Sequence, residues 1–156
     1  MDNNDLIGRI RYATRLDDAE CQRLLQLGAL SVDQDTVAAW RLKPDEAEFR
    51  ACPDKAINAL LTGLVLDRRG PPDASRGSSQ KQPTSVDNNQ VLKQLRIALS
   101  LRTESVQALL IAGGGELSKS EINALFRRPE ARNYRVCGDQ VLRWFLTGLA
   151  RQRSSS

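Results

Sequence analysis

Two short stretches, FRACPD at residues 49–54 and YRVCGD at residues 134–139, repeat nearly the same phrase within one chain. When the chain is aligned on itself at this offset of 85, residues 3–66 match residues 88–151 without a gap, and 18 of the 64 paired positions are identical. Many of the other pairs exchange one apolar residue for another, as Ile10 and Leu95 do. One offset held over this length indicates an internal duplication.

The copies are residues 3–66 (unit one) and 88–151 (unit two), and residues 67–87 lie between them. The intervening stretch, DRRGPPDASRGSSQKQPTSVD, is rich in glycine, proline, serine and charge, so it predicts a flexible linker. Each unit alone is close to the size at which a single core is marginal. We therefore expect the two units to pack together with approximate twofold symmetry.

Apolar residues recur at helical spacing throughout both units, and no segment alternates apolar and polar residues as a half-buried strand would. Ser118 followed by Glu121 is a capping-box pattern, and Asp33 takes the same position in unit one. Asp54 and Asp139 are placed to open the last helix of each unit. The sequence predicts an all-α protein made by tandem duplication of a four- to five-helix unit.

Four glycines recur in register. Gly28 and Gly113 are expected to end the second helix of each unit in a left-handed conformation. Gly63 and Gly148 fall inside the last helix, where glycine costs about 1 kcal/mol relative to alanine. A close helix crossing explains them best, and we expect that crossing between the two units.

The composition restricts the chemistry. The chain has no histidine, and Cys21, Cys52 and Cys137 lack the paired spacing of a zinc site, so no metal, cofactor or imidazole-dependent catalysis is expected. The cysteines are expected to be small buried residues of a reduced protein. No apolar run approaches the length of a membrane helix, and the acidic start does not resemble a secretory signal. These features predict a cytoplasmic, non-enzymatic protein without membrane contact, with a carboxylate-dependent enzyme as the remaining catalytic alternative.

Four motifs together resemble a known bacterial family: RIRY at 9–12, FRACPD, NNQVLKQLRIALSL at 88–101 and NYRVCGDQVLRWFLTGLA at 133–150. They are similar to the YehS-like proteins, and the likeness covers nearly the whole chain apart from the linker. The resemblance implies a duplicated all-helical domain of unknown function. It therefore supplies no catalytic residues.

The two units differ in charge. Unit one has eight basic and ten acidic residues, a net charge of −2, whereas unit two has ten and five, a net charge of +5. The candidate polyanion-binding residues are Arg127, Arg128, Arg132, Arg135, Arg143 and Tyr134. Arginines beside an aromatic ring suit phosphate contacts and base stacking, which favours binding of nucleic acid, RNA slightly ahead of DNA. A solvated basic face, or one that docks onto unit one, explains the same residues.

A second functional class is a protein-interaction module that holds an acidic or amphipathic segment between the units. Three further pairs stand in register: Arg11 with Arg96, Arg50 with Arg135, and Asp54 with Asp139. Because guanidinium groups bind carboxylates through paired hydrogen bonds, we expect an arginine–aspartate clamp at the helix corner of each unit, with anion pockets as the alternative. The oligomeric state does not follow from the sequence.

Overall fold

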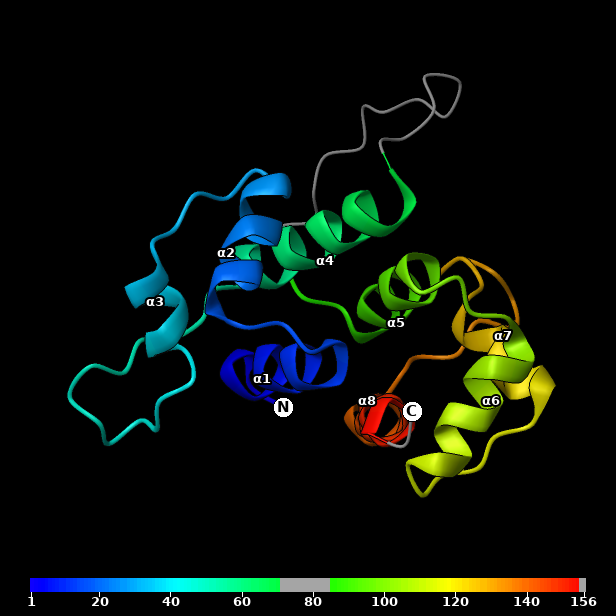
Figure 1. Ribbon diagram of the computed structural model, residues 1–156. Helices are drawn as coiled ribbons and strands as arrows, with labels where there is room; N and C mark the ends of the chain where they lie inside the picture. Colours follow the sequence, from blue (N-terminus) through cyan, green and yellow to red (C-terminus); the bar gives the residue numbers. More distant parts are fainter. Residues whose placement is uncertain (71–84, 155–156) are drawn as a thin grey trace.

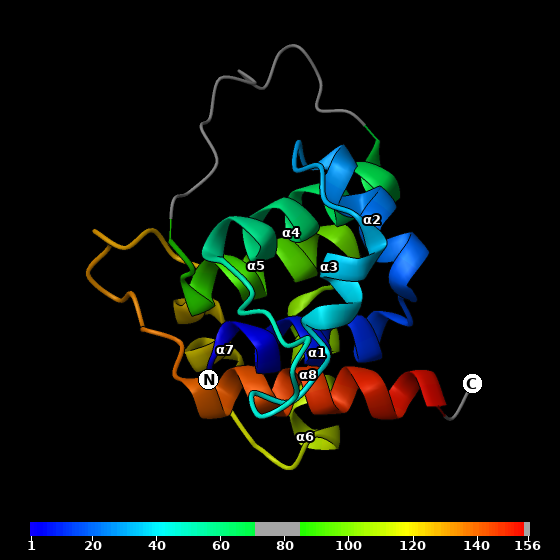
Figure 2. The same cartoon turned by 90° about the vertical axis from the view of Figure 1, so that its left-hand side faces the viewer.

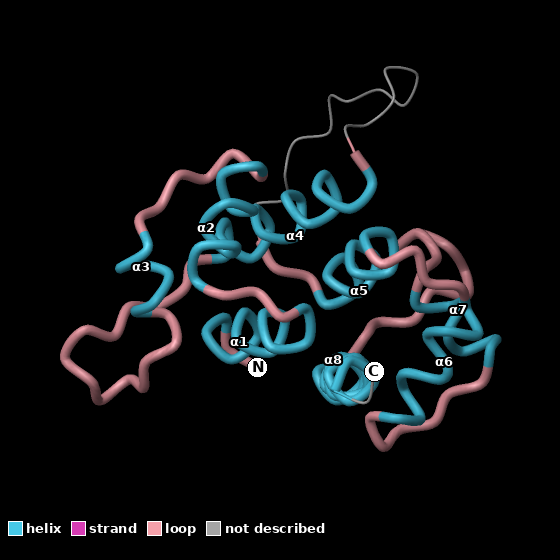
Figure 3. The backbone as a smooth tube through the Cα atoms, in the orientation of Figure 1, coloured by secondary structure: helices cyan, strands magenta, loops and turns pink. Residues whose placement is uncertain are grey.

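The computed structural model describes residues 1–70 and 85–154, and in these ranges all regular structure is helical (Figures 1 and 3). Unit one contributes α1 (Asn3–Thr14), α2 (Asp18–Leu27), α3 (Gln34–Ala39) and α4 (Asp54–Arg69). Unit two contributes α5 (Asn88–Ala98), α6 (Thr103–Ala112), α7 (Lys119–Leu125) and α8 (Asp139–Ser154). The predicted all-α duplication is confirmed, with four helices in each described unit.

The third helix of each unit begins where its capping residues place it. The Asp33 carboxylate accepts a hydrogen bond from the Thr36 amide at 2.8 Å. In unit two the Ser118 hydroxyl accepts from the Glu121 amide at 3.1 Å, and the Glu121 carboxylate accepts from the Ser118 amide at 3.0 Å. Two otherwise orphaned donors are satisfied reciprocally, which confirms the capping box.

The last helix of each unit extends beyond the C-terminal boundary that the sequence predicted for that unit. Helix α4 continues through residues 67–69, which the composition assigns to the linker, and α8 continues beyond residue 151 to Ser154. Both helices keep an acidic residue in the first turn, Asp54 and Asp139, as predicted. The central part of the expected linker, residues 71–84, lies outside the described residues.

The glycines allow the backbones of two helices to touch within each unit. A Cβ atom on Gly63 of α4 would lie 1.8 Å from the carbonyl oxygen of Leu24 in α2, and one on Gly28 would lie 1.9 Å from the oxygen of Ala59 in α4. Gly148 and Gly113 make the equivalent contacts between α8 and α6. The expected crossing between the units is therefore wrong: it lies inside each one.

The same contact explains why Gly28 does not end α2 in a left-handed conformation. Its φ is −82°, and the left-handed residue is the next one, Ala29, with φ 70°. In unit two the left-handed position after Gly113 falls on Gly114, with φ 99°. Gly28 and Gly113 are required for the close approach of the helices and not for the turn.

The first helix of each unit packs on the last helix of the other. Helix α1 lies against α8, and α5 lies against α4, as the two perpendicular views show (Figures 1 and 2). Fully buried side chains from these four helices include Ile10, Leu60, Leu95 and Phe145. They belong to one continuous core that also includes residues of α2 and α6. The two units therefore share a core, in the twofold arrangement that the duplication predicted.

The repeated phrase is tied to the start of the first helix by an asparagine. The Asn4 side-chain amide donates to the carbonyl oxygens of Trp40 at 3.0 Å and Arg50 at 2.9 Å, and its oxygen accepts from the Cys52 amide at 3.0 Å. The equivalent Asn89 makes the same three bonds, to Leu125, Arg135 and Cys137. The phrase recurs because its backbone closes each unit against this asparagine.

Candidate functional site

The six candidate polyanion-binding residues differ in exposure and in their hydrogen-bond partners. Arg127, Arg128 and Arg132 are exposed on the segment between α7 and α8, and no ion pair of these three is found in the described part of the chain. The other three are placed differently. Arg135 donates to the Glu121 carboxylate at 2.5 Å, Tyr134 is half-buried, and Arg143 lies half-buried on α8.

The expected arginine–aspartate clamp is also paired differently. Asp54 accepts a hydrogen bond at 2.6 Å from Asn3, which also donates to the Cys52 carbonyl oxygen. Arg50 donates to the Thr36 hydroxyl. The short asparagine at the start of α1 already faces the opening turn of α4, whereas Arg50 points along the loop towards α3.

Unit two repeats this pairing. Asn88 donates to Asp139 at 2.8 Å, and the Met1 amino group also contacts that carboxylate. Both contacts hold the pKa of Asp139 below its usual value, and the contact with the amino group has the larger effect. The sequence carried a signal for the asparagines, because Asn3-Asn4 and Asn88-Asn89 are polar pairs kept in register at a helix start.

Another predicted clamp residue, Arg11, pairs with a carboxylate that the sequence pattern does not single out. Its Nη2 donates to Asp18 at 2.6 Å, and Nη2 of Arg41 donates to the other oxygen of the same carboxylate at 2.7 Å. Partial burial opposes ionisation of Asp18, but the hydrogen bonds from both guanidinium groups outweigh it and lower its pKa below 3.8. We call Arg11, Asp18 and Arg41 the arginine corner.

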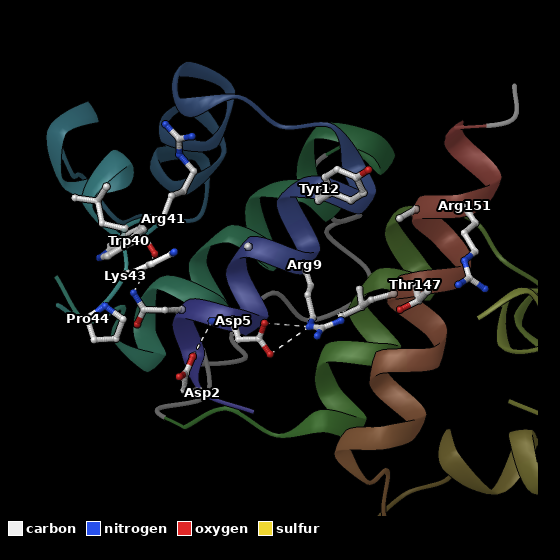
Figure 4. Close-up of a pocket in the computed structure, with 15 residues that line it drawn as sticks. Asp2, Asp5, Arg9, Tyr12, Trp40, Arg41, Lys43, Pro44, Thr147 and Arg151 are labelled. Atoms are coloured by element: carbon white, nitrogen blue, oxygen red, sulfur yellow. Dashed lines mark hydrogen bonds and ion pairs between the residues drawn. The ribbon is translucent and has the colours of Figure 1, made fainter. Parts of the chain in front are cut away.

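A groove with a volume of about 910 Å³ lies between the units (Figure 4). Its floor is the outer face of α1, one wall is the segment 40–44 after α3, and the other wall is the C-terminal half of α8. It is lined by Asp2, Asn4, Asp5, Gly8, Arg9, Tyr12, Trp40, Arg41, Leu42, Lys43, Pro44, Leu146, Thr147, Ala150 and Arg151. The sequence favoured, as an alternative, a segment held between the units, but it indicated none of the residues that line this groove.

The middle of the groove floor is open because of Gly8. A Cβ atom placed there would meet no atom within 4 Å, so packing does not require this glycine. One turn further along, the Tyr12 side chain is 74% exposed. A glycine inside a helix without a packing reason, next to an exposed aromatic residue, is the signal that could have revealed the groove from the sequence.

Basic side chains predominate around the groove. Arg9 is paired with Asp5 at 3.1 Å, Arg41 with Asp18, and Arg151 donates to the Ala112 carbonyl oxygen at 2.7 Å. The ammonium group of Lys43 has no hydrogen bond or ion pair to any residue the structure describes. The lining has four basic and two acidic side chains, and its net charge is positive.

The equivalent surface of unit two has different side chains at the positions that form the groove. Lys93 takes the place of Gly8, Ile97 that of Tyr12, and Phe126 that of Arg41. The guanidinium of Arg96 lies 4.4 Å from the centre of the Phe126 ring and donates to the Thr103 hydroxyl at 3.3 Å. The hollow that remains there has about 440 Å³ and is lined by Arg69, Lys93, Arg96, Ile97, Ser100, Leu101 and Phe126.

The three cysteines are free thiols. All three are buried, and burial raises the pKa of Cys21 to about 11 and those of Cys52 and Cys137 to about 12. These thiols therefore stay protonated near neutral pH. Across 1–70 and 85–154, no three cysteine, aspartate or glutamate side chains are grouped to hold a metal ion, and no helix is long and apolar enough to cross a membrane.

Fold and groove together define a duplicated all-helical protein whose two units share one core and one open cleft. Residues 3–70 and 88–154 match the family described as protein of unknown function (DUF1456), and the chain belongs to that family. It is 37% identical over 150 residues to the uncharacterized protein YehS of Escherichia coli (strain K12), covering 96% of this chain and 95% of that protein. No solved structure matches the chain.

Proposed function

We propose that the protein is a non-enzymatic binding module whose groove holds an acidic, amphipathic segment of a partner protein. The observation that carries this proposal is the open floor at Gly8, which lies between basic side chains and the exposed ring of Tyr12. A groove of about 910 Å³ is large enough for several side chains of a bound segment.

The charge of the groove favours an acidic partner. Asp2 is engaged as the N-cap of α1, and Asp5 is paired with Arg9. The Lys43 ammonium group has no carboxylate partner among the described residues, whereas the Arg151 guanidinium donates to the Ala112 carbonyl oxygen at the end of α6. Complementary charges across an interface speed association and suppress wrong partners.

The apolar part of the lining favours an amphipathic segment. Leu42 and Pro44 lie on one wall, and Leu146 and Ala150 lie on the other, one turn apart on α8. A short helix laid along α1 would place residues spaced by three or four positions between these walls. Its opposite face would carry the acidic side chains towards the basic rim.

A random-peptide library displayed on phage tests the proposal with the intact protein immobilised. Selection should enrich acidic peptides with apolar residues three and four positions apart. The matched variant Gly8→Leu should keep the fold, because the site is open and helical, yet fill the groove and lose the selected peptides by more than tenfold in affinity. Lys93→Leu, at the equivalent position outside the groove, should bind as the parent does.

Enrichment of basic peptides, or equal binding by the parent and Gly8→Leu, would contradict the groove as the site. Raising the salt concentration should weaken the binding of the selected peptides, because their charges face exposed lysine and arginine side chains. Single-stranded RNA that binds the parent but not Gly8→Leu would reassign the same groove to nucleic acid.

A second candidate function is nucleic-acid binding through unit two. It is favoured by Arg127, Arg128 and Arg132, which are exposed on one segment without a carboxylate partner in the part of the chain that is described. Changing Arg127, Arg132 and Arg143 to Leu, Ala and Asn, the residues of unit one, should leave the fold intact. It should weaken binding to purified single-stranded RNA and lower its salt dependence by about 0.7 in log–log slope for each phosphate that is no longer neutralised. A parent protein that binds neither RNA nor DNA at low salt contradicts this candidate.

A further inference from the structure

The guanidinium of Arg11 is incompletely satisfied although it is buried. The residue is only 5% exposed, its Nε donates to the Leu16 carbonyl oxygen at 3.4 Å, and its Nη2 donates to Asp18. Its Nη1 is buried and has no hydrogen-bond partner among the residues that are described. An unsatisfied buried donor on a charged group costs about 1–3 kcal/mol, so native proteins rarely keep one without a reason.

A second hollow of about 610 Å³ lies beside this guanidinium. It is lined by Gly8, Arg11, Tyr12, Arg15, Leu16, Asp17, Asp18, Arg41 and Ala150. Four of these residues, Gly8, Tyr12, Arg41 and Ala150, also line the groove, so the hollow is a continuation of the groove. A segment bound in the groove can therefore reach the arginine corner with one side chain.

We propose that the arginine corner binds one oxyanion, a carboxylate or a phosphate group, with Nη1 of Arg11 as the buried donor and Arg41 as the outer one. This inference rests on the proposed function, because the oxyanion is the anchoring acidic side chain of the docked segment. Arginine suits this role, since its fork of donors matches the oxygens of carboxylate and phosphate.

Two carboxylates, those of Asp17 and Asp18, also line this hollow. Asp17 caps α2 by accepting from the Glu20 amide at 2.8 Å. Asp18 occupies one edge of both guanidinium groups and is ionised near neutral pH, since their hydrogen bonds lower its pKa despite its partial burial. With Arg15, the three guanidinium groups still exceed the two carboxylates by one positive charge. Asp18 therefore weakens the site, and its neutralisation should strengthen it.

Unit two does not provide an equivalent site. Its Arg96 is covered by Phe126, and Thr103 replaces the carboxylate that holds Arg11. Ser100 stands in the place of Arg15. The hollow of unit two is lined by Arg69, Lys93 and Arg96, and among the described residues no buried nitrogen there lacks a hydrogen-bond partner.

Titration of the ¹⁵N-labelled protein with potassium phosphate, against potassium chloride at matched ionic strength, tests the inference. Phosphate should cause saturable shifts of the amide signals of Leu16 and Asp18, and chloride should not. The Asp18→Asn variant should saturate at a phosphate concentration lower than the parent's, by up to about fivefold, because one negative charge of the pocket is removed. Arg41→Gln, a change of an exposed residue, should lose the response, and Arg96→Gln in unit two should keep it.

Linear shifts that match those with chloride, or equal affinities in the parent and Asp18→Asn, would overturn the proposal. Repeating the titration with acetate distinguishes the sources: comparable binding assigns a side-chain carboxylate, and binding of phosphate alone assigns a phosphorylated side chain or free phosphate. The titration needs no peptide. If phosphate does not bind here while acidic peptides bind the parent and not Gly8→Leu, the arginine corner fails and the proposed function stands.

Discussion

In unit one the buried guanidinium of Arg11 shares Asp18 with Arg41, whereas in unit two the equivalent Arg96 lies against the ring of Phe126 and donates to Thr103. Both arginines also donate to the carbonyl oxygen five residues later, so the backbone role is common to both units. What surrounds the arginine differs. In unit one a carboxylate lies between two guanidinium groups, whereas in unit two an aromatic ring lies against the guanidinium.

Other positions remain the same in both units, and they are those that hold the backbone. Asn4 and Asn89 make the same three hydrogen bonds, and Gly63 and Gly148 allow the same helix contact. After the duplication, the contacts that determine the fold were kept, and the outer face of the first helix diverged. The units therefore differ most on the face of α1 that forms the floor of the groove, where Lys93 and Ile97 stand in the places of Gly8 and Tyr12.

Separating the units should have the largest effect. Because α1 packs on α8 and α5 packs on α4, each unit alone exposes the apolar face that its partner covers. Chains 1–70 and 85–156, produced separately, should lose most of the roughly 5–15 kcal/mol of stability typical of a domain. Circular dichroism should show no cooperative melting for either chain alone. Cooperative melting should return when the two chains are mixed. If either chain is monomeric and melts cooperatively alone, the shared core is not needed for folding.

Alanine at the helix crossing should have the next largest effect, and the effect should be similar in both units. Gly63→Ala and Gly148→Ala each force a Cβ atom to within 1.8 Å of a backbone oxygen in the crossing helix. Because backbone must move, each change should lower the free energy of unfolding by about 3 kcal/mol. Urea denaturation measures this loss.

Gly8→Ala is the matched control for the crossing glycines, because its Cβ atom meets open space in the middle of α1. It should raise the free energy of unfolding by up to about 1 kcal/mol. Loss of stability in all three variants would show that helix glycines have a general role here and not one set by the crossing.

Most of the fold could be predicted from the sequence, because it depends on patterns that survive in both copies. The helical spacing of apolar residues and the capping positions Asp33 and Ser118 are local features. The placement of the glycine crossing was not predictable in the same way. Gly63 indicates that something approaches closely, but which helix approaches depends on the packing of all four.

The candidate site was less predictable. Charge counts directed attention to unit two, where Arg135 turned out to be paired with Glu121. The groove depends on residues from α1, from the segment after α3 and from α8, and no sequence pattern brings these three together. The pairing of Arg11 with Asp18 was equally hard to predict, because unit one has several acidic residues that a long arginine side chain could pair with.

The asparagines allow a sharper comparison between the units. Asn89 is buried, with 7% exposure, whereas Asn4 is half-buried. Asn89→Ala should therefore cost about 3 kcal/mol, because three backbone groups lose their partner away from water. Asn4→Ala should cost about 1–2 kcal/mol, since water can replace part of what is lost. Equal losses in urea denaturation would indicate that both asparagines are shielded to the same degree.

The smallest effect should come from the carboxylate that only unit one has. Because Asp18 has a lower pKa in the folded protein than its ordinary 3.8, its pairing with Arg11 and Arg41 stabilises the fold above that value. The contribution is lost as the pH falls through the lower folded-state pKa.

Near neutral pH, Asp18→Asn should lower the free energy of unfolding by about 1 kcal/mol or less, as expected for a partly exposed ion pair. As the pH falls through about 3.8 and below, the difference from the parent should narrow, since the parent's unfolded chain binds a proton at Asp18 more readily than its folded state does. Urea denaturation at several pH values measures the difference, and Thr103→Ser, at the equivalent neutral position of unit two, should show no such narrowing. A difference that stays constant down to pH 3 would mean that the charge of Asp18 does not stabilise the arginine corner, and that its side chain acts there only as a hydrogen-bond acceptor.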